Sequence, residues 1–132
     1  EKMVPSIEGE WARKRRMMSH AWPIVVRGGL LDPRGWPPRY ALMIASHRWL
    51  RYAGPFLHVA AALATRRGLA LHALLVLAAV TAPRAGAGGG RLSRPLLVAR
   101  YYVLTQASIA FGLYDWLRHG TEAGWDQAEG TR

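Results

Sequence analysis

The fold of this chain is decided by one basic stretch, Gly9-Glu10-Trp11-Ala12-Arg13-Lys14-Arg15-Arg16-Met17-Met18-Ser19-His20. At the helical period of about 100° per residue, Trp11, Met18 and Trp22 share one side, and the cations lie beside or opposite them. Aromatic and methionine side chains opposite cations are typical of a helix that lies in the plane of a membrane surface. The stretch therefore predicts an interfacial helix that ends near Pro23, and its cations can also hold phosphate.

The distribution of charge favours a membrane over a nucleic acid as the anionic partner. The 132-residue chain has a net charge of +10 at pH 7, and an excess of this size indicates anionic partners. No acidic residue lies between Asp32 and Asp115, and the arginines in that interval separate apolar runs. Arginines in such places suit anionic lipid head groups, whereas nucleic-acid-binding arms gather their cations in polar sequence. We therefore expect membrane lipids as partners and no nucleic acid.

The order of segments predicts an all-α chain without a sheet, in which amphipathic interface helices accompany two to three membrane-embedded helices. No run shows the alternation of a strand. We expect five regions: an interface region with two basic amphipathic helices at 1–52, a membrane helical hairpin at 53–82, a Gly/Arg linker at 83–95, a membrane helix at 96–120 and a polar tail at 121–132.

The second interface helix is predicted from about Arg39 to Tyr52, after a loop that is rich in Gly and Pro. Its basic side is made by His47, Arg48 and Arg51, which we assign to the membrane interface. A proline at position 55 suits the first turn of a new helix.

Two apolar runs follow, at 56–64 and 69–82, each shorter than the ~20 residues that a helix needs to cross a bilayer. They predict either a tight helical hairpin of two tilted segments or one kinked, buried helix. His58 and His72 lie within these runs, where hydrogen-bonded packing histidines are expected. The run at 96–117 is long enough to span a bilayer, and Gly120 can cap it.

Aromatic residues near the ends of membrane helices often lie at the membrane surface. We assign Trp116, near the end of the last apolar run, and Trp125, in the tail, to the membrane interface.

The chain carries no catalytic constellation of its own. Its five histidines are scattered without a His-Glu-x-x-His pattern, and no Gly-x-Ser-x-Gly is present. The glycines at 86–90 fit neither the phosphate-loop nor the dinucleotide pattern. Because cysteine is absent, disulfides and thiolate metal sites are excluded. We therefore expect no catalytic residue and no metal ligand in this chain.

Three motifs occur in order along the sequence: Glu10-x-x-Arg13-Lys14-x-Arg16, Ser46-His47-Arg48-x-Leu50-Arg51-x-x-x-Pro55 and Trp125-x-x-x-x-x-Thr131-Arg132. Together they resemble the C-terminal part of membrane-bound family 2 glycosyltransferases, the superfamily of cellulose and hyaluronan synthases. In that family the first motif closes the catalytic domain, the second leads into the membrane and the third ends the chain. The resemblance implies a cytosolic nucleotide-sugar domain upstream of interface and membrane helices.

The resemblance also implies roles for the basic helix. Glu10, Arg13, Lys14 and Arg16 would bind the donor diphosphate, and Trp11 would lie near the acceptor. A guanidinium binds a diphosphate by paired hydrogen bonds and stabilises the charge that develops on the leaving group. Processive members carry Gln-x-x-Arg-Trp at the matching place, and this chain has neither the Gln nor the Trp. Transfer of a single sugar is therefore at least as consistent with the sequence as polymer synthesis.

The function implied is that of a hexosyltransferase-type enzyme, multi-pass in the inner or plasma membrane, which transfers a sugar from a nucleotide-sugar donor to a lipid or glycan acceptor. The family's divalent metal, Mg²⁺ or Mn²⁺, is held by an Asp-x-Asp that this sequence lacks. We therefore expect a fragment of a longer protein that is inactive alone. The alternative is a non-catalytic basic protein that binds anionic lipids.

Overall fold

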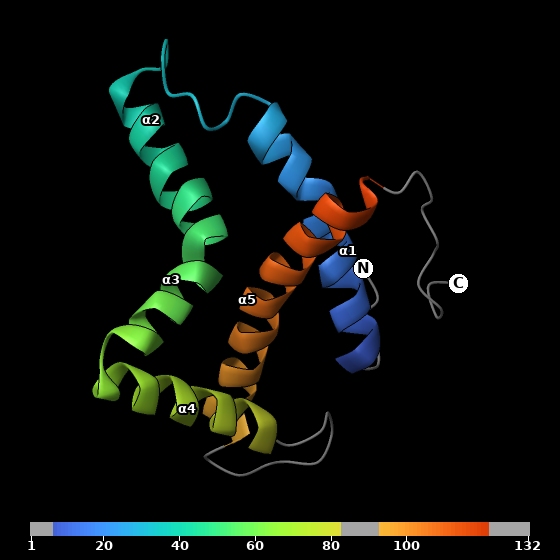
Figure 1. Ribbon diagram of the computed structural model, residues 1–132, viewed down its shortest axis with the longest axis vertical. Coiled ribbons are helices and arrows are strands. Elements are labelled where there is room, and N and C mark those ends of the chain that lie inside the picture. Colours follow the sequence, from blue (N-terminus) through green and yellow to red (C-terminus); the bar gives the residue numbers. More distant parts are fainter. Residues whose placement is uncertain (1–6, 83–92, 122–132) are drawn as a thin grey trace. The chain divides into compact units, whose positions relative to one another are not determined.

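The computed structural model describes residues 7–82 and 93–121, and this part of the chain is all-α with no strand (Figure 1). Four continuous helical segments make it up. They are α1 (Ile7–Arg27); α2 (Pro38–Ile44), which continues through the π-helical turn η1 (Ala45–Trp49) into α3 (Leu50–Ala64); α4 (Arg66–Thr81); and α5 (Ser93–His119). The all-α prediction without a sheet is thus confirmed for the described residues.

The chain divides into two compact units, which are described separately below. The α1 unit comprises Glu1–Gly54 and Ser108–Arg132, and the hairpin unit comprises Pro55–Ala107.

Helix α1 is longer than the sequence predicts, because it continues through Pro23 to Arg27. The expected end at Pro23 is therefore wrong. A proline inside a helix removes one backbone hydrogen bond, but the next turn buries Val25, of which only 2% is exposed. Packing of this turn against the core outweighs the lost bond. The helix ends at the glycines that follow, where the Gly28 N–H donates to the Ile24 carbonyl over 3.0 Å and Gly29 adopts a φ of 74°.

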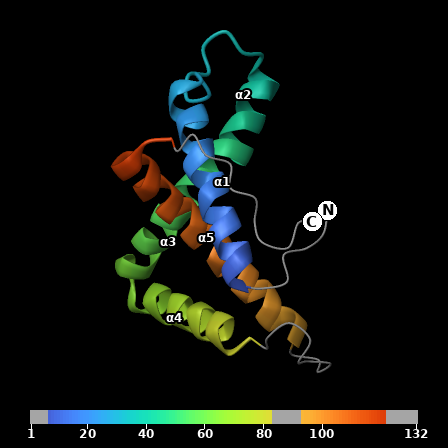
Figure 2. The same ribbon diagram turned by 90° about the vertical axis from the view of Figure 1, so that its right-hand side faces the viewer.

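The core of the α1 unit lies where α1 packs on the C-terminal part of α5 (Figure 2). Its buried side chains are Met18, Trp22, Val25, Tyr52, Ile109 and Trp116. The Trp22 indole N–H donates to the Ile109 carbonyl over 2.8 Å. The Trp22 ring packs edge-on against the Tyr52 ring, with the two ring centroids 4.8 Å apart. The apolar side predicted for the basic helix is therefore the side that packs.

A glycine lets the two helices come close. A Cβ at Gly112 would lie 2.5 Å from the Met18 Cβ and 2.8 Å from the Ser19 backbone nitrogen. Ser108, one turn earlier on α5, is fully buried. A small residue on each of two successive turns is the pattern that allows helix backbones to approach.

The second helical segment starts one residue before the predicted Arg39 but does not stop at Tyr52. The expected new helix at Pro55 is also wrong, since Pro55 lies inside α3 and is buried. The segment instead changes its geometry at η1, where the helix widens for one turn. Helices accommodate an extra residue in this way, often as a single π-helical turn.

In the hairpin unit, the two apolar runs form separate helices that meet at Thr65. This residue is extended, with φ −148° and ψ 153°, and its side-chain oxygen accepts a hydrogen bond from the Gly68 N–H over 2.9 Å. Gly68 allows a tight turn, because a Cβ there would lie 2.1 Å from the Ala61 carbonyl oxygen. Of the two readings of this region, two helices joined by a turn is the one observed.

Helix α5 begins at Ser93, within the segment predicted as linker, and Pro95 lies in its first turn as helix-starting prolines do. The predicted cap is confirmed: Gly120 has a φ of 75°, and its N–H donates to the Trp116 carbonyl over 2.9 Å. Among the described helices, α5 alone is long and apolar enough to cross a membrane, with 27 residues and a mean hydropathy of 1.3 in its best window. The linker at 83–92 and Trp125 lie outside the described residues.

Candidate anion-binding site on the basic helix

Three of the four residues predicted to bind diphosphate form one ion-pair cluster on α1. The Arg13 guanidinium donates to both carboxylate oxygens of Glu10 over 3.0 Å, and the Lys14 ammonium lies 3.4 Å from one of them. The hydrogen bonds from Arg13, and then the charges of Arg13 and Lys14, hold the pKa of the Glu10 carboxyl below its usual value against the opposing effect of partial burial. The carboxylate therefore stays ionised and orients both cations.

Arg15 makes an ion pair between the helices that the sequence did not predict. Its Nε lies 2.5 Å from Asp115 Oδ2 and its Nη2 lies 2.6 Å from Oδ1, so that the pair is bidentate. The guanidinium also lies 5.4 Å from the Phe111 ring centroid. The hydrogen bonds to Asp115 raise the pKa of Arg15. Arg15 is thus held in one place and charged at every physiological pH.

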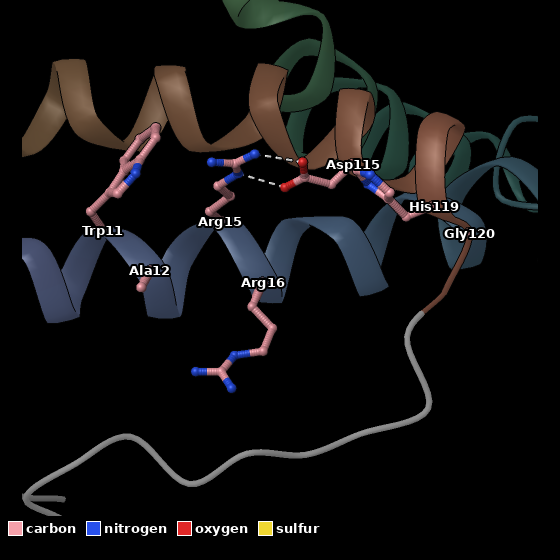
Figure 3. Close-up of a pocket in the computed structure, with 7 residues that line it drawn as sticks. All are labelled: Trp11, Ala12, Arg15, Arg16, Asp115, His119 and Gly120. Carbon is pink, nitrogen blue, oxygen red and sulfur yellow. Dashed lines mark hydrogen bonds and ion pairs between the residues drawn. The ribbon is translucent and has the colours of Figure 1, made fainter.

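An open pocket of about 490 Å³ lies where the basic helix meets the end of α5. Its lining residues are Trp11, Ala12, Arg15, Arg16, Asp115, His119 and Gly120. Figure 3 shows Trp11 and Arg15 reaching from α1 toward α5, whereas Arg16 points away from α5. Trp11, expected near the acceptor, packs edge-on against Phe111 with ring centroids 5.6 Å apart.

The remaining predicted site residues do not come together with this pocket. His47, Arg48 and Arg51 are exposed on η1 and the start of α3, and their place at a membrane interface remains a prediction. Trp116, expected as an interfacial anchor, lies in the core with 9% of its surface exposed. The Arg27 guanidinium lies over the Trp116 ring, 5.4 Å from the ring centroid.

The hairpin unit contains a separate chain of polar contacts. His58 Nδ1 lies 3.0 Å from His72 Nε2, and His58 Nε2 is hydrogen-bonded to the Tyr102 hydroxyl. His72 Nδ1 lies 2.7 Å from the Gly68 carbonyl oxygen, so that each ring is held on both sides. The expectation of hydrogen-bonded packing histidines is confirmed. No group of three or more His, Cys, Asp or Glu that could hold a metal ion occurs among residues 7–82 and 93–121.

Backbone carbonyls satisfy an arginine of α5 in the hairpin unit. Arg100 of α5 donates over 3.0 Å to the Ala79 carbonyl, and it also bonds the Ala82 carbonyl. These are carbonyls at the end of α4, which have no partners within their own helix. An arginine in an apolar helix is tolerated when backbone carbonyls satisfy it.

Comparison with protein-family models, with curated proteins and with solved structures found no match to this chain. The assignment of its function therefore rests on its own residues.

Proposed function

We propose that this chain is the C-terminal membrane module of a membrane-bound family 2 glycosyltransferase, which transfers a sugar from a nucleotide-sugar donor to a lipid or glycan acceptor. The observation that carries the proposal is the place of the motif Glu10-x-x-Arg13-Lys14-x-Arg16. It lies on a helix whose apolar side packs at the end of α5, the described helix with the length of a membrane span. Cations there would lie where a soluble donor meets an acceptor in the membrane.

The exposed surface of the hairpin unit supports the membrane part of the proposal. Large apolar side chains cover it, and Leu63 and Val80 are 79% and 72% exposed. Apolar surface on this scale is unfavourable in water, at about 25 cal/mol per Å², and marks a membrane or partner contact. In the proposed arrangement, α4 and α5 with the end of α3 are the two to three membrane-embedded helices, and α1 and α2 lie at the surface.

In the proposed reaction, Arg13, Lys14 and Arg16 bind the donor diphosphate and stabilise the charge that develops as the sugar leaves. Glu10 positions Arg13 by the bidentate contact described above. The divalent metal of the family does not fit the described residues, which contain no suitable cluster of ligands. Metal and catalytic base would belong to an upstream catalytic domain.

The test is the variant Arg13→Ala in the full-length enzyme, assayed in membranes with nucleotide-sugar donors. Loss of a charged hydrogen-bond donor at the diphosphate should lower turnover about tenfold or more. The protein should stay in the membrane fraction, because the apolar surface of the hairpin unit is unchanged. Arg39→Ala, an exposed arginine on α2, is the matched control. Unchanged turnover in Arg13→Ala would remove this residue from the mechanism.

A second candidate is a non-catalytic protein that binds anionic lipids. The observation that favours it is the exposed basic group His47, Arg48 and Arg51 on a segment that leads into the apolar hairpin unit. It predicts binding of the chain to anionic vesicles that falls with salt, because exposed charges are screened. Sugar transfer by the full-length protein would rule out this candidate.

A further inference from the structure

A chain of hydrogen bonds in the hairpin unit joins three helices and has no part in the proposed reaction. It runs from Tyr102 of α5 to His58 of α3 and on to His72 of α4, and it ends at the Gly68 carbonyl. Both imidazole rings are only partly buried, so small solutes can reach them. The sequence of the hairpin unit contains no Asp or Glu, so no carboxylate of this unit competes for the two rings.

The hydrogen positions in this chain follow from its last acceptor. A carbonyl oxygen can only accept, so His72 Nδ1 carries a hydrogen and donates to the Gly68 oxygen over 2.7 Å. In the neutral ring His72 Nε2 is then an acceptor, and His58 Nδ1 donates to it over 3.0 Å. His58 Nε2 in turn accepts from the Tyr102 hydroxyl. One hydrogen therefore lies between two nitrogens that face each other, and each ring is held from its far side.

Histidines that bind metal ions are held in the same way. Their second ring nitrogen is normally bonded to a carbonyl, a carboxylate or a water, which fixes the tautomer and the direction of the ring. Here the Gly68 carbonyl holds His72, and the Tyr102 hydroxyl takes the place of a water at His58.

The separation of the two facing nitrogens also suits a shared ion. Two nitrogens bound to one ion at about 2.0–2.1 Å lie about 2.9 Å apart in adjacent square-planar positions and about 3.3 Å apart in a tetrahedral site. The observed distance of 3.0 Å between His58 Nδ1 and His72 Nε2 falls between these values.

We propose that His58 Nδ1 and His72 Nε2 together bind a late first-row divalent ion, Cu²⁺ or Zn²⁺, with water in the remaining positions. Imidazole nitrogens suit these ions, whereas Mg²⁺ and Ca²⁺ prefer oxygen ligands. No local pattern reveals the pair, because the two histidines lie 14 positions apart on different helices. The inference does not rest on the proposed function and differs from the absence of metal ligands expected from the sequence.

Binding of the ion moves a hydrogen but releases none. The His58 hydrogen leaves Nδ1, and the ring takes the neutral tautomer with its hydrogen on Nε2. Nε2 then donates to the Tyr102 oxygen, and Tyr102, which is 39% exposed, turns its own hydrogen outward. Each ring also turns so that its lone pair points at the ion and no longer at the other ring. Tyr102 is thus a positioning residue and not a ligand.

The first experiment titrates Cu²⁺ alone into the 132-residue chain in neutral detergent and follows binding by calorimetry and electron paramagnetic resonance. We expect one ion at the pair, with a spectrum split by two nitrogens. His72→Gln removes one of the two protein ligands and should weaken binding about tenfold or more. His47→Gln, at an exposed histidine of η1, is the matched control and should stay within about twofold of the native affinity.

Tyr102→Phe tests the positioning role, because it leaves both ligands and the aromatic ring in place. It should weaken binding about tenfold while the spectrum still shows two nitrogens. Tyr114→Phe, at another exposed tyrosine of α5, is the control and should leave the affinity unchanged. Far-UV circular dichroism reports whether each variant remains folded, and Tyr102→Phe tests the site even if His72→Gln does not fold. An unchanged affinity in Tyr102→Phe would refute the positioning role.

Zn²⁺ should compete with Cu²⁺ for the pair, and Mg²⁺ should not. The inference is overturned if neither Cu²⁺ nor Zn²⁺ binds, if His72→Gln binds Cu²⁺ as tightly as His47→Gln, or if the spectrum shows a single nitrogen. The chain of hydrogen bonds would then be a packing contact only. None of these results bears on sugar transfer, so failure of this inference is distinct from failure of the proposed function.

Discussion

The substitution Gly112→Ala should loosen the packing of α1 against α5. The new Cβ would lie 2.5 Å from the Met18 Cβ and 2.8 Å from the Met18 carbonyl carbon, whereas ordinary contact begins near 3.4 Å. Since one of these atoms belongs to the α1 backbone, a rotamer change cannot relieve the clash. The two helices must move apart by about 0.9 Å at this point.

The expected change in the free energy of unfolding follows from two opposing effects. Overpacking of this kind destabilises by about 1–3 kcal/mol, and alanine is favoured over glycine in a helix by up to about 1 kcal/mol. The net loss of stability should therefore be about 1–2 kcal/mol. Val98→Ala, at an exposed position of the same helix, is the control and should stay within about 0.5 kcal/mol.

The assay is thermal or denaturant unfolding in detergent, followed by the fluorescence of the buried tryptophans. Separation of the helices should also weaken the contact between Arg15 and Asp115, which lies one turn from Gly112. Asp115→Asn should therefore cost less stability in the Gly112→Ala background than in the native chain. A Gly112→Ala protein as stable as the native one, or strictly additive effects of the two changes, would refute the close approach described for α1 and α5.

Three further predictions concern the other contacts. The pKa of Glu10 is lowered in the folded chain, so its ion pairs stabilise α1 fully above the ordinary pKa of 4.5. This stabilisation is lost as the pH falls through the folded pKa. The loss of helical circular dichroism signal on acid titration should therefore be smaller in Glu10→Gln than in the native chain. Trp22→Phe removes the indole N–H that donates to the Ile109 carbonyl and should lower the stability of the α1 unit by about 0.5–1.5 kcal/mol in the same unfolding assay; an unchanged midpoint would contradict the hydrogen bond. Gly68→Ala places a Cβ against the Ala61 carbonyl oxygen and should therefore lower the melting temperature or speed amide hydrogen exchange at the turn. Amide exchange at the native rate would show that the turn is wider than described.

The apolar side of α1 could be predicted because helical periodicity is a local property. Trp11, Met18 and Trp22 were placed on one side from their spacing, and all three pack toward α5 or the core. The ends of the helices were not predictable in the same way. The expectation that one helix ends near Pro23 and another begins at Pro55 considers the backbone alone. Burial of side chains around these prolines outweighs that backbone preference.

The α5 side of the candidate site was missed for a different reason. The pair between Arg15 and Asp115 joins residues 100 positions apart, and no local pattern encodes it. One signal was nevertheless present, since Asp115 is the first acidic residue after Asp32 and lies in an apolar helix, where a carboxylate needs a cation. A second signal was the pair of small residues Ser108 and Gly112, four apart, which is typical of a close helix contact.

The π-helical turn η1 has a consequence for insertions and deletions. It lies between Ile44 and Tyr52, both of which are buried although they are eight positions apart, a spacing that would leave them about 80° out of line on a regular α-helix. A wider turn brings them back toward the same side. Deletion of one residue within Ala45–Trp49 would restore a regular helix in which these two positions are seven apart and only about 20° out of line. Both side chains would then still face the same side, so chains descended from a common ancestor can gain or lose this one residue while both positions stay apolar.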